Sequence, residues 1–323
     1  MRLPRVSICI PTYCQVDFLR GTLRSIKTQD FNDYELIISD DSPDDTVEQL
    51  VVSFDFDERL RYHRNPVPLG SPENWNEAVR QARGDYIKIL HHDDRLSHPG
   101  ALTEFARMLD EHPDANFAFS ASLVENTAKG KNRIHRPAKY QLASLSATPE
   151  ELFFGNAIGA PSAAIYRNGL NIEYDQRMKW LVDIDFYIRV LQQNPRFVYS
   201  PEVLVVTTSG ANHQITEICQ NNAEVELLEY LLLCHKVGRK LQNNSGAQRV
   251  WFILFEKYQI YSKKNIERLG IKLSAHDNKL LEYFFNSYHK KWLSRLPFRV
   301  YAGLPEPLKA VIIYVRNLWL LKN

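Results

Sequence analysis

The chain has 323 residues, 44% of them hydrophobic and 24% charged, which is typical of a globular protein with one sizeable core and a smaller second unit. The formal net charge is +2, and the four cysteines show no CxxC spacing. These features argue against a disulfide framework and favour a reducing, cytoplasmic setting. No run of about 18 apolar residues and no apolar leader is present, so we expect neither a membrane-spanning helix nor a signal peptide.

Strand and helix patterns alternate through the first half of the chain. Short apolar runs predict strands at 6–10, 35–39, 60–64 and 86–90. Helical periodicity predicts helices at 17–29, through 47–51, and at 71–82, the last ended by Gly84. This βαβα order predicts an α/β fold with a doubly wound, mostly parallel sheet.

The second half begins with a predicted helix at 101–111 and ends in helices. The remaining predicted elements are a strand at 117–122, a polar and basic loop at 125–145, a helix at 150–154, a strand at 162–166, a helix at 182–193, and strands at 197–199 and 203–207. The loop is either mobile or closes over a ligand. Helices are expected at 223–241, 248–269, 276–291 and 306–321. We therefore predict two domains, 1–215 and a helical, basic region at 216–323.

The stretch from Tyr86 to Asp94, YIKILHHDD, is a buried strand that ends in two adjacent carboxylates. Like charges repel, so Asp93 and Asp94 are not placed side by side for stability. Ligands of open α/β sheets collect at the carboxyl ends of strands. The pattern favours a divalent metal that bridges protein carboxylates to a diphosphate.

Three segments in this order resemble the family 2 glycosyltransferases with the GT-A fold. They are VSICIPTYCQVDFLRGTLRSIKTQDFNDYELIISDDS, LGSPENWNEAVRQARGDYIKILHHDD and LVDIDFYIRV, and the resemblance covers roughly residues 4–215. It implies inverting, metal-dependent transfer of one sugar from a nucleoside diphosphate sugar, UDP being favoured. The acceptor implied is a glycan or lipid-linked hydroxyl in surface polysaccharide biosynthesis.

The nucleotide site is expected where the first two strands end. Pro11, Thr12 and Tyr13 follow the first strand, and the ring of Tyr13 could stack on the base. By resemblance Asp41 holds the base, and Asn74 lies near the nucleotide. The alternatives are ordinary loop structure for Thr12 and Tyr13, and capping of the next helix for Asp40 and Asp41.

The diphosphate site is expected at the acidic pair. By resemblance Asp93 touches the ribose or the metal, Asp94 binds Mg²⁺ or Mn²⁺, and His213 reaches the metal or the leaving diphosphate. His91 stands where the family often has an acid, and we expect it to pack beside the site. Zinc held through His91 and His92 is a rival, although adjacent strand residues point to opposite faces. His213 could equally be structural.

The catalytic base is expected at the start of the helix at 182–193. By resemblance Asp183 takes the proton of the acceptor hydroxyl, and Asp185 caps the helix or pairs with Arg189. Val182 replaces the glutamate that the family has before the base. The alternative is that both acids merely favour a helix N-terminus.

The acceptor is expected to contact the segment GNAIGAPSAAIYR, residues 155–167. Small residues such as Ser162 leave room for a sugar near the backbone, and Trp180 could stack on a sugar or belong to the core. A catalytically inactive module that binds nucleotide sugar or glycan is the alternative function. A nicotinamide dehydrogenase is disfavoured because the turn after the first strand, PTYCQVDF, lacks glycine.

The charge is divided unevenly along the chain. Residues 230–323 hold 17 Lys and Arg against 5 Asp and Glu, and the rest of the chain carries a net charge of −10. Residues 290–323 form an amphipathic, basic and aromatic segment that favours contact with a membrane surface, with core packing or a homodimer as alternatives. Nucleic acid is not an expected partner, because the acidic mouth of the sheet would repel phosphates.

Overall fold

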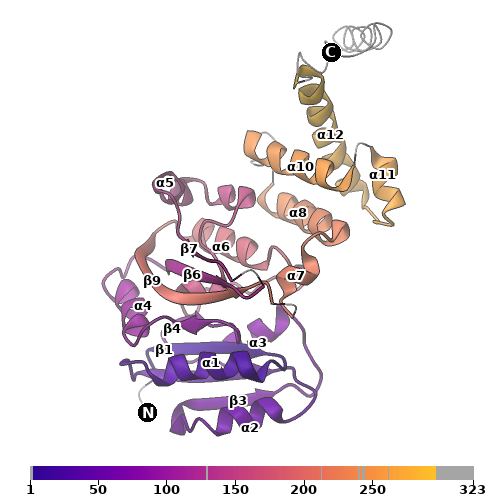
Figure 1. The fold of residues 1–323 in the computed structure, drawn as a ribbon. Helices are drawn as coiled ribbons and strands as arrows, with labels where there is room; N and C mark the ends of the chain where they lie inside the picture. Colours follow the sequence, from indigo (N-terminus) through magenta and orange to yellow (C-terminus); the bar gives the residue numbers. More distant parts are fainter. Residues whose placement is uncertain are drawn as a thin grey trace, which may run out of the picture. The chain divides into compact units, whose positions relative to one another are not determined.

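The computed structural model describes residues 3–128, 130–211, 213–238, 241, 244–260 and 262–295. The chain divides into two compact units, Met1–Leu233 and Cys234–Asn323 (Figure 1). The sheet and the helices that cover it belong to the first unit, and the described part of the second unit is helical.

The first part of the sheet follows the predicted alternation of strands and helices. The elements are β1 (Val6–Thr12), α1 (Val16–Lys27), β2 (Tyr34–Asp40), α2 (Thr46–Val52), the 3₁₀ turn η1 (Asp57–Arg59), β3 (Leu60–Arg64), α3 (Glu73–Arg80) and β4 (Tyr86–Ile89). β1 pairs in parallel with β2 and β4, and β2 pairs in parallel with β3. Every residue of β1, β2 and β4 is buried, as expected for strands covered on both faces.

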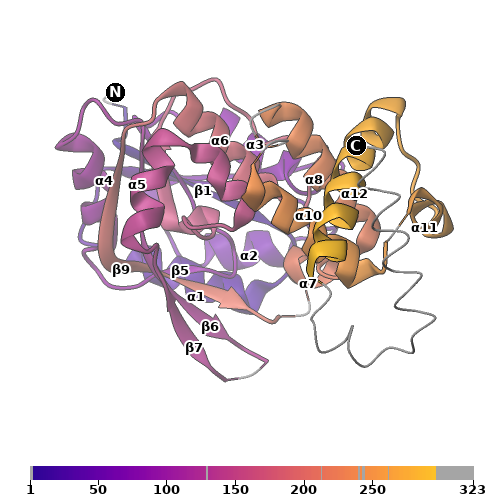
Figure 2. The same cartoon turned by 90° about the horizontal axis from the view of Figure 1, so that it is seen from above.

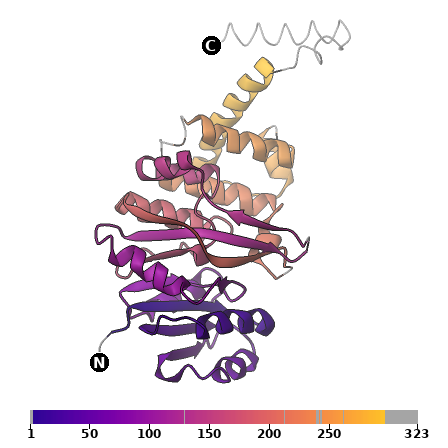
Figure 3. The ribbon, with the colours of Figure 1, turned by 60° about the vertical axis from the view of Figure 1, so that its left-hand side comes forward.

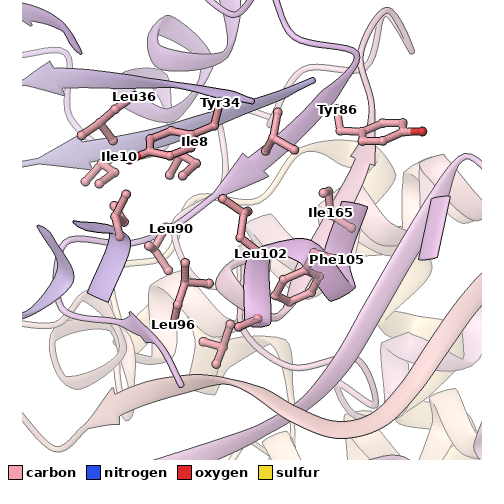
Figure 4. Packing of buried hydrophobic residues seen from close by; sticks show 14 of the residues in the cluster. Ile8, Ile10, Tyr34, Leu36, Tyr86, Leu90, Leu96, Leu102, Phe105 and Ile165 are labelled. Carbon is pink, nitrogen blue, oxygen red and sulfur yellow. The ribbon is translucent and has the colours of Figure 1, made fainter. Parts of the chain in front are cut away.

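Helices cover both faces of these strands. Apolar side chains of α1, α2 and α4 (Ala101–Asp110) join those of one strand face in a single core cluster. Figure 4 shows part of this packing, including Ile8, Ile10, Leu36, Leu90, Leu102 and Phe105. On the other face, α3 approaches β1 closely enough for the Cys9 thiol to donate to the Ala78 carbonyl at 3.5 Å.

The second part of the sheet is mixed. Its elements are β5 (Arg95–Leu96), β6 (Phe117–Asn126), β7 (Asn132–His135), α5 (Lys139–Ala147), the 3₁₀ turns η2 (Pro149–Phe154) and η3 (Pro161–Ala163), β8 (Ala164–Arg167), α6 (Val182–Gln193) and β9 (Phe197–Ser209). The strand order is β3-β2-β1-β4-β8-β6-β9-β5, with β7 paired to β6. In Figure 3 the indigo strands of the first part lie on one side of the long magenta strand β6. β8 is antiparallel to both of its neighbours and joins the two parts.

The prediction of a loop at 125–145 was wrong. β6 continues to Asn126, β7 returns antiparallel to it, and α5 follows. The hairpin of β6 and β7 projects beyond the rest of the sheet (Figure 2). Because three of the four β7 residues are exposed, its sequence carries no alternation of apolar and polar positions, and backbone pairing with β6 forms the strand.

Two further details differ from prediction. The strands predicted at 197–199 and 203–207 form one strand, β9. Its pairing register with β6 shifts on either side of Ala121, and this irregularity leaves Pro201 without a partner in the register. Gly84 does not end α3, which stops at Arg80. A Cβ on Gly84 would lie 2.7 Å from the backbone nitrogen of Ser7, so glycine is required there by close packing.

Among the described residues, the C-terminal helices have other limits than predicted: the region predicted as one helix at 248–269 holds two, and the last described helix extends beyond the predicted 276–291 at its C-terminal end. They are α7 (Ile215–Cys219), α8 (Ala223–Val237), α10 (Ser245–Tyr258), α11 (Lys263–Arg268) and α12 (Ala275–Arg295). The helix predicted at 248–269 is interrupted because Gln259 adopts a left-handed conformation at φ 54°. In the second unit α10 packs on α12 through Trp251 and Phe284, whose rings lie 5.1 Å apart.

The proposed membrane segment at 290–323 falls largely outside this description, because residues 296–323 and the helix predicted at 306–321 are not among the described residues. Within the residues that are described, no helix combines the length and the apolar character that a membrane crossing requires.

Candidate active site

The loops after β1, β2 and β4 meet at one edge of the sheet, because these three strands run parallel. Thr12 stands opposite Asp40 in the register of β1 and β2. The Asp40 carboxylate accepts hydrogen bonds from the hydroxyls of Thr12 (2.9 Å), Ser42 (2.6 Å) and Tyr62 (2.7 Å). Asp40 therefore fixes the turn that presents the next acid.

Asp41 organises the loop that follows β3. Its carboxylate accepts from the side-chain amide of Asn65 (2.8 Å) and from the N–H groups of Leu69 (3.0 Å) and Gly70 (2.8 Å). Asn65 also donates to Asn74, at 3.2 Å. Asp41 is only 3% exposed and its carboxylate is held by donors of the protein, so contact of Asp41 with the base stays a prediction.

The other predicted nucleotide residues lie in the same region. Asn74 donates from its side chain to the carbonyl of Thr12 at 3.1 Å. Tyr13 is 56% exposed, so one face of its ring is free to stack on a flat ligand. The carbonyl of Pro11 is 3.3 Å from Nδ1 of His92, which joins this loop to the corner after β4.

The corner after β4 brings together His91, Asp93 and Asp94. Their nitrogen and oxygen ligand atoms lie within 4.8 Å of one another. Burial lowers the pKa of His91 to about 4, so its imidazole is neutral at physiological pH. The Nε2 atoms of His91 and His92 are buried and have no hydrogen-bond partner among the described residues. Neutral imidazole nitrogen beside carboxylate oxygen is a donor set that fits a divalent cation such as Mn²⁺.

The two aspartates of this corner have different surroundings. Asp94 is buried, and its Oδ1 accepts from the Thr208 N–H at 3.0 Å. Burial and the adjacent Asp93 charge raise the pKa of Asp94. Burial opposes ionisation of Asp93 too, but the His213 and Gln214 side chains and the nearby imidazoles hold the pKa of Asp93 below its ordinary value. His213 lies 3.6 Å and Gln214 2.7 Å from Oδ2 of Asp93.

Lys88 is a buried cation beneath this corner that the sequence pattern did not single out. Its ammonium donates to the carbonyls of Ser162 and of Ala164, the latter at 3.1 Å, and lies 4.1 Å from the centre of the Phe105 ring. Burial lowers the pKa of Lys88 to about 7, while the charge of Asp94 opposes that change. Lys88 is therefore an amine whose charge near neutral pH depends on the ionisation of Asp94.

Asp183 stands in the first turn of α6 as predicted and is half-buried. Its Oδ2 accepts from the Asn156 side chain at 2.6 Å, and its Oδ1 accepts from the Ile184 N–H at 2.9 Å. Burial raises the pKa of Asp183 to about 6 in spite of these hydrogen bonds. The predicted pairing of Asp185 with Arg189 is confirmed, with Nε of Arg189 at 2.9 Å from Oδ2 of Asp185.

The segment at 155–167 links the metal corner to Asp183. Ser162 is fully buried, and its hydroxyl accepts from the His91 N–H at 3.0 Å and hydrogen bonds to Asp94. Asn156 accepts from the Gly159 N–H at 2.8 Å while it holds Asp183. The acidic corner and the predicted base are thus joined through one short segment. A role of Ser162 in acceptor binding stays a prediction.

Trp180, the second predicted acceptor residue, is half-buried just before α6. The backbone N–H of Trp180 donates to the buried carboxylate of Glu229 at 2.8 Å. Stacking of Trp180 on a sugar also stays a prediction. Neither Asn156 nor Glu229 was predicted to contribute. Asn156 could have been noted as the one polar side chain in GNAIGAP, whereas a glutamate in a helix gives no signal of its partner.

Comparison with known proteins supports the resemblance to the family 2 glycosyltransferases. The family model described as glycosyl transferase family 2 matches residues 7–175, just over half of the chain. An uncharacterized protein of Mycobacterium tuberculosis, MT1568, is 28% identical over 77% of this chain and 82% of its own length. The GalNAc(5)-diNAcBac-PP-undecaprenol beta-1,3-glucosyltransferase of Campylobacter jejuni is 32% identical over 34% of this chain and 36% of its own.

Solved structures share the fold at low sequence identity. Residues 1–349 of TarS from S. aureus, in complex with UDP-GlcNAc, superpose with a TM-score of 0.58 at 19% identity, covering 97% of this chain and 87% of that one. This chain covers 53% of the longer TarS structure. The mannosyltransferase PcManGT from Pyrobaculum calidifontis, in complex with GDP-Man and Mn²⁺, gives a TM-score of 0.57 at 15% identity, covering 99% and 88%. The family match and this shared architecture agree with the motifs, and the chain belongs to glycosyl transferase family 2 with a GT-A fold.

Proposed function

We propose that this glycosyltransferase transfers one sugar, with inversion, from a nucleoside diphosphate sugar to a hydroxyl of a glycan or lipid-linked acceptor. The observation that carries the proposal is the connection of two chemically different centres. An acidic corner with a neutral imidazole is joined through residues 156–162 to a separate carboxylate, Asp183. One centre suits a diphosphate and the other suits a hydroxyl.

The donor would occupy the edge formed by β1, β2 and β4. We assign the base to the surface between Tyr13 and the loop that Asp41 holds, and the ribose and diphosphate to Asn74, Asp93 and the corner after β4. UDP is the favoured nucleotide, and TarS, which has the same fold, was solved with UDP-GlcNAc and with UDP.

A divalent cation, Mg²⁺ or Mn²⁺, is proposed at the corner after β4. Asp93, Asp94 and the His91 imidazole would hold it, with His213 beside Asp93. Bound there, such an ion neutralises negative charge that develops on the departing nucleoside diphosphate. The buried Nε2 of His91 has no hydrogen-bond partner in the described part of the chain, and this observation favours a cation at this place.

Asp183 is the proposed general base. Its pKa of about 6 lies close to neutrality, so the carboxylate is ionised at pH 7 and still basic enough to accept a proton. As the acceptor oxygen forms its bond to the anomeric carbon, its proton passes to Asp183, and the bond from that carbon to the diphosphate breaks. Asn156 and the Ile184 N–H hold the carboxylate in one orientation during this step.

We infer a glycan or lipid-linked acceptor used in surface polysaccharide biosynthesis, because the Campylobacter jejuni relative is named for a PP-undecaprenol-linked substrate. Residues 1–215 would form the catalytic domain, with residues 216–323 appended to it.

Purified protein incubated with a panel of nucleotide sugars and Mn²⁺ or Mg²⁺ tests the proposal. We expect release of the nucleoside diphosphate from one donor and loss of that turnover in Asp183→Asn, with unchanged turnover in Glu111→Gln, an exposed acid on the same unit. Tight nucleotide-sugar binding without turnover of any donor or transfer to any glycan acceptor would instead indicate the alternative function, a non-catalytic binding module.

A further inference from the structure

Three consecutive backbone N–H groups just before α6 donate to one buried carboxylate. The N–H of Lys179 donates to Oε1 of Glu229 at 2.7 Å, and those of Trp180 and Leu181 donate to Oε2, each at 2.8 Å. Glu229 lies on α8, next to α6 in Figure 1, and is 5% exposed. Hydrogen bonds from backbone N–H groups to an ionised carboxylate are short and strong, so α8 is firmly attached at this point.

These donors come immediately before the turn that carries the predicted base. Leu181 is the residue that precedes α6, and Asp183 is the second residue of the helix. Lys179 and Trp180 precede the helix and Leu181 is its cap residue, so the Glu229 carboxylate holds the chain where it enters the first turn. Asn156 holds the Asp183 carboxylate from the other side. The position of Asp183 therefore depends on two partners distant in the sequence.

We propose that Glu229 is a positioning residue for sugar transfer, fixing the start of α6 so that Asp183 meets the acceptor hydroxyl. The inference rests on the proposed role of Asp183 as the base. α8 begins well after residue 175, where the family match ends. A residue beyond the family match, in the same compact unit as the sheet, would thus contribute to the reaction.

Charge gives Glu229 a second effect on Asp183. Burial is the main cause that raises the pKa of Asp183, and the negative charge of Glu229 adds to it. The other titratable groups facing Asp183 are the phenols of Tyr174 and Tyr187, which burial keeps neutral at physiological pH. Burial raises the pKa of Glu229, while the three backbone N–H groups and the charge of Lys179 favour its ionised form. Replacing the Glu229 charge should therefore make Asp183 easier to ionise.

Glu229→Gln tests the proposal, because the amide keeps the side-chain length but turns one oxygen into a donor that cannot accept from the chain. We expect kcat to fall about 10- to 100-fold with unchanged affinity for UDP, since a displaced base disturbs the reacting geometry alone. The acid limb of the kcat profile should move to lower pH. Backbone amides 179–181 should exchange hydrogen faster.

Two further variants separate the causes. Glu229→Asp keeps the charge but shortens the reach, so we expect a lower kcat with the acid limb in place. Glu224→Gln removes a charge from an exposed position of the same helix and should behave like the parent protein.

Parent-like kcat and pH profile in Glu229→Gln would overturn the inference, and so would a parallel loss of UDP affinity and Tm, which would show only a damaged fold. If the parent transfers no sugar at all, the proposed function fails instead. In that case the pH dependence of the ¹³C NMR signal of the Asp183 carboxyl still tests whether Glu229 affects Asp183. The signal is assigned by its absence in Asp183→Asn. An unchanged Asp183 titration and unchanged amide exchange in Glu229→Gln would refute the coupling.

Discussion

The side-chain amide of Asn156 donates to Oδ2 of Asp183 at 2.6 Å, across 27 residues of sequence. The Asn156 oxygen accepts from the N–H groups of Ile158 (3.1 Å) and Gly159 (2.8 Å), so the amide cannot flip without losing both bonds. Asn156 therefore offers Asp183 a donor in a fixed direction, and this hydrogen bond favours the ionised carboxylate.

Replacing Asn156 by Ala should lower kcat and move the acid limb of the kcat profile to higher pH. The direction follows because the lost donor stabilised the charged form of Asp183. It is opposite to the shift expected for Glu229→Gln, so the two variants form a matched pair. Steady-state kinetics from pH 5 to 9 would measure both, with the exposed Asn32→Ala as control. Shifts in the same direction in both variants would contradict this account of Asp183.

The parent enzyme should show a kcat that rises about tenfold per pH unit below pH 6 and levels off above it. Burial raises the pKa of Asp183 to about 6, so the basic form is lost progressively as pH falls through that value. Donor binding is measured separately by calorimetry at each pH, because acidification also affects the metal corner. If the residual activity of Asp183→Asn still falls below pH 6, the titration belongs to another group.

Asp94→Ala and Asp183→Ala should both abolish transfer, for different reasons. We expect Asp94→Ala to lose the metal-dependent part of UDP binding, because Asp94 belongs to the only group of possible metal ligands found among the described residues. Asp183→Ala should bind UDP and Mn²⁺ like the parent protein. Isothermal titration calorimetry with and without EDTA distinguishes the two variants. A fully active Asp183→Ala would rule out the assigned base.

Gly159→Ala should destabilise the protein by about 1–3 kcal/mol. Gly159 has φ +101°, and an added Cβ would lie 3.0 Å from Cδ2 of His135 on β7. Gly155→Ala is the matched control in the same segment, because Gly155 has an extended backbone (φ 163°) and a Cβ added there would meet no atom within 4 Å. Urea unfolding of both variants would test this, and equal midpoints would mean that the segment adapts to the added methyl group.

Much of the sheet domain could be predicted because local patterns agree with the fold. The strands at 6–10, 35–39 and 60–64 are found within one or two residues of their predicted limits, and α6 has the predicted range, 182–193. The acids directly after buried strands predicted that the site lies at the carboxyl edge of the sheet, because parallel strands end on the same side.

The parts that escaped prediction depend on contacts distant in sequence. β7 is a strand because β6 lies beside it, although three of its four residues are polar and three are exposed. Gly84 resembles a glycine that ends a helix, but glycine is required there because the backbone of Ser7 leaves no room for a Cβ. Glu229 and Lys88 are ordinary residues in a helix and a strand, and only the folded chain shows which groups they meet.

Strand β8 has four residues, yet in the described sheet it stands between β4 and β6. Two of its residues pair with β4, and three pair with β6, the strand from which the hairpin projects. Substitutions in the loops on one side of β8 leave its pairing on the other side intact. A substitution in β8 itself affects its pairing with both β4 and β6. We therefore expect this strand to tolerate substitution less well than the loops that flank it.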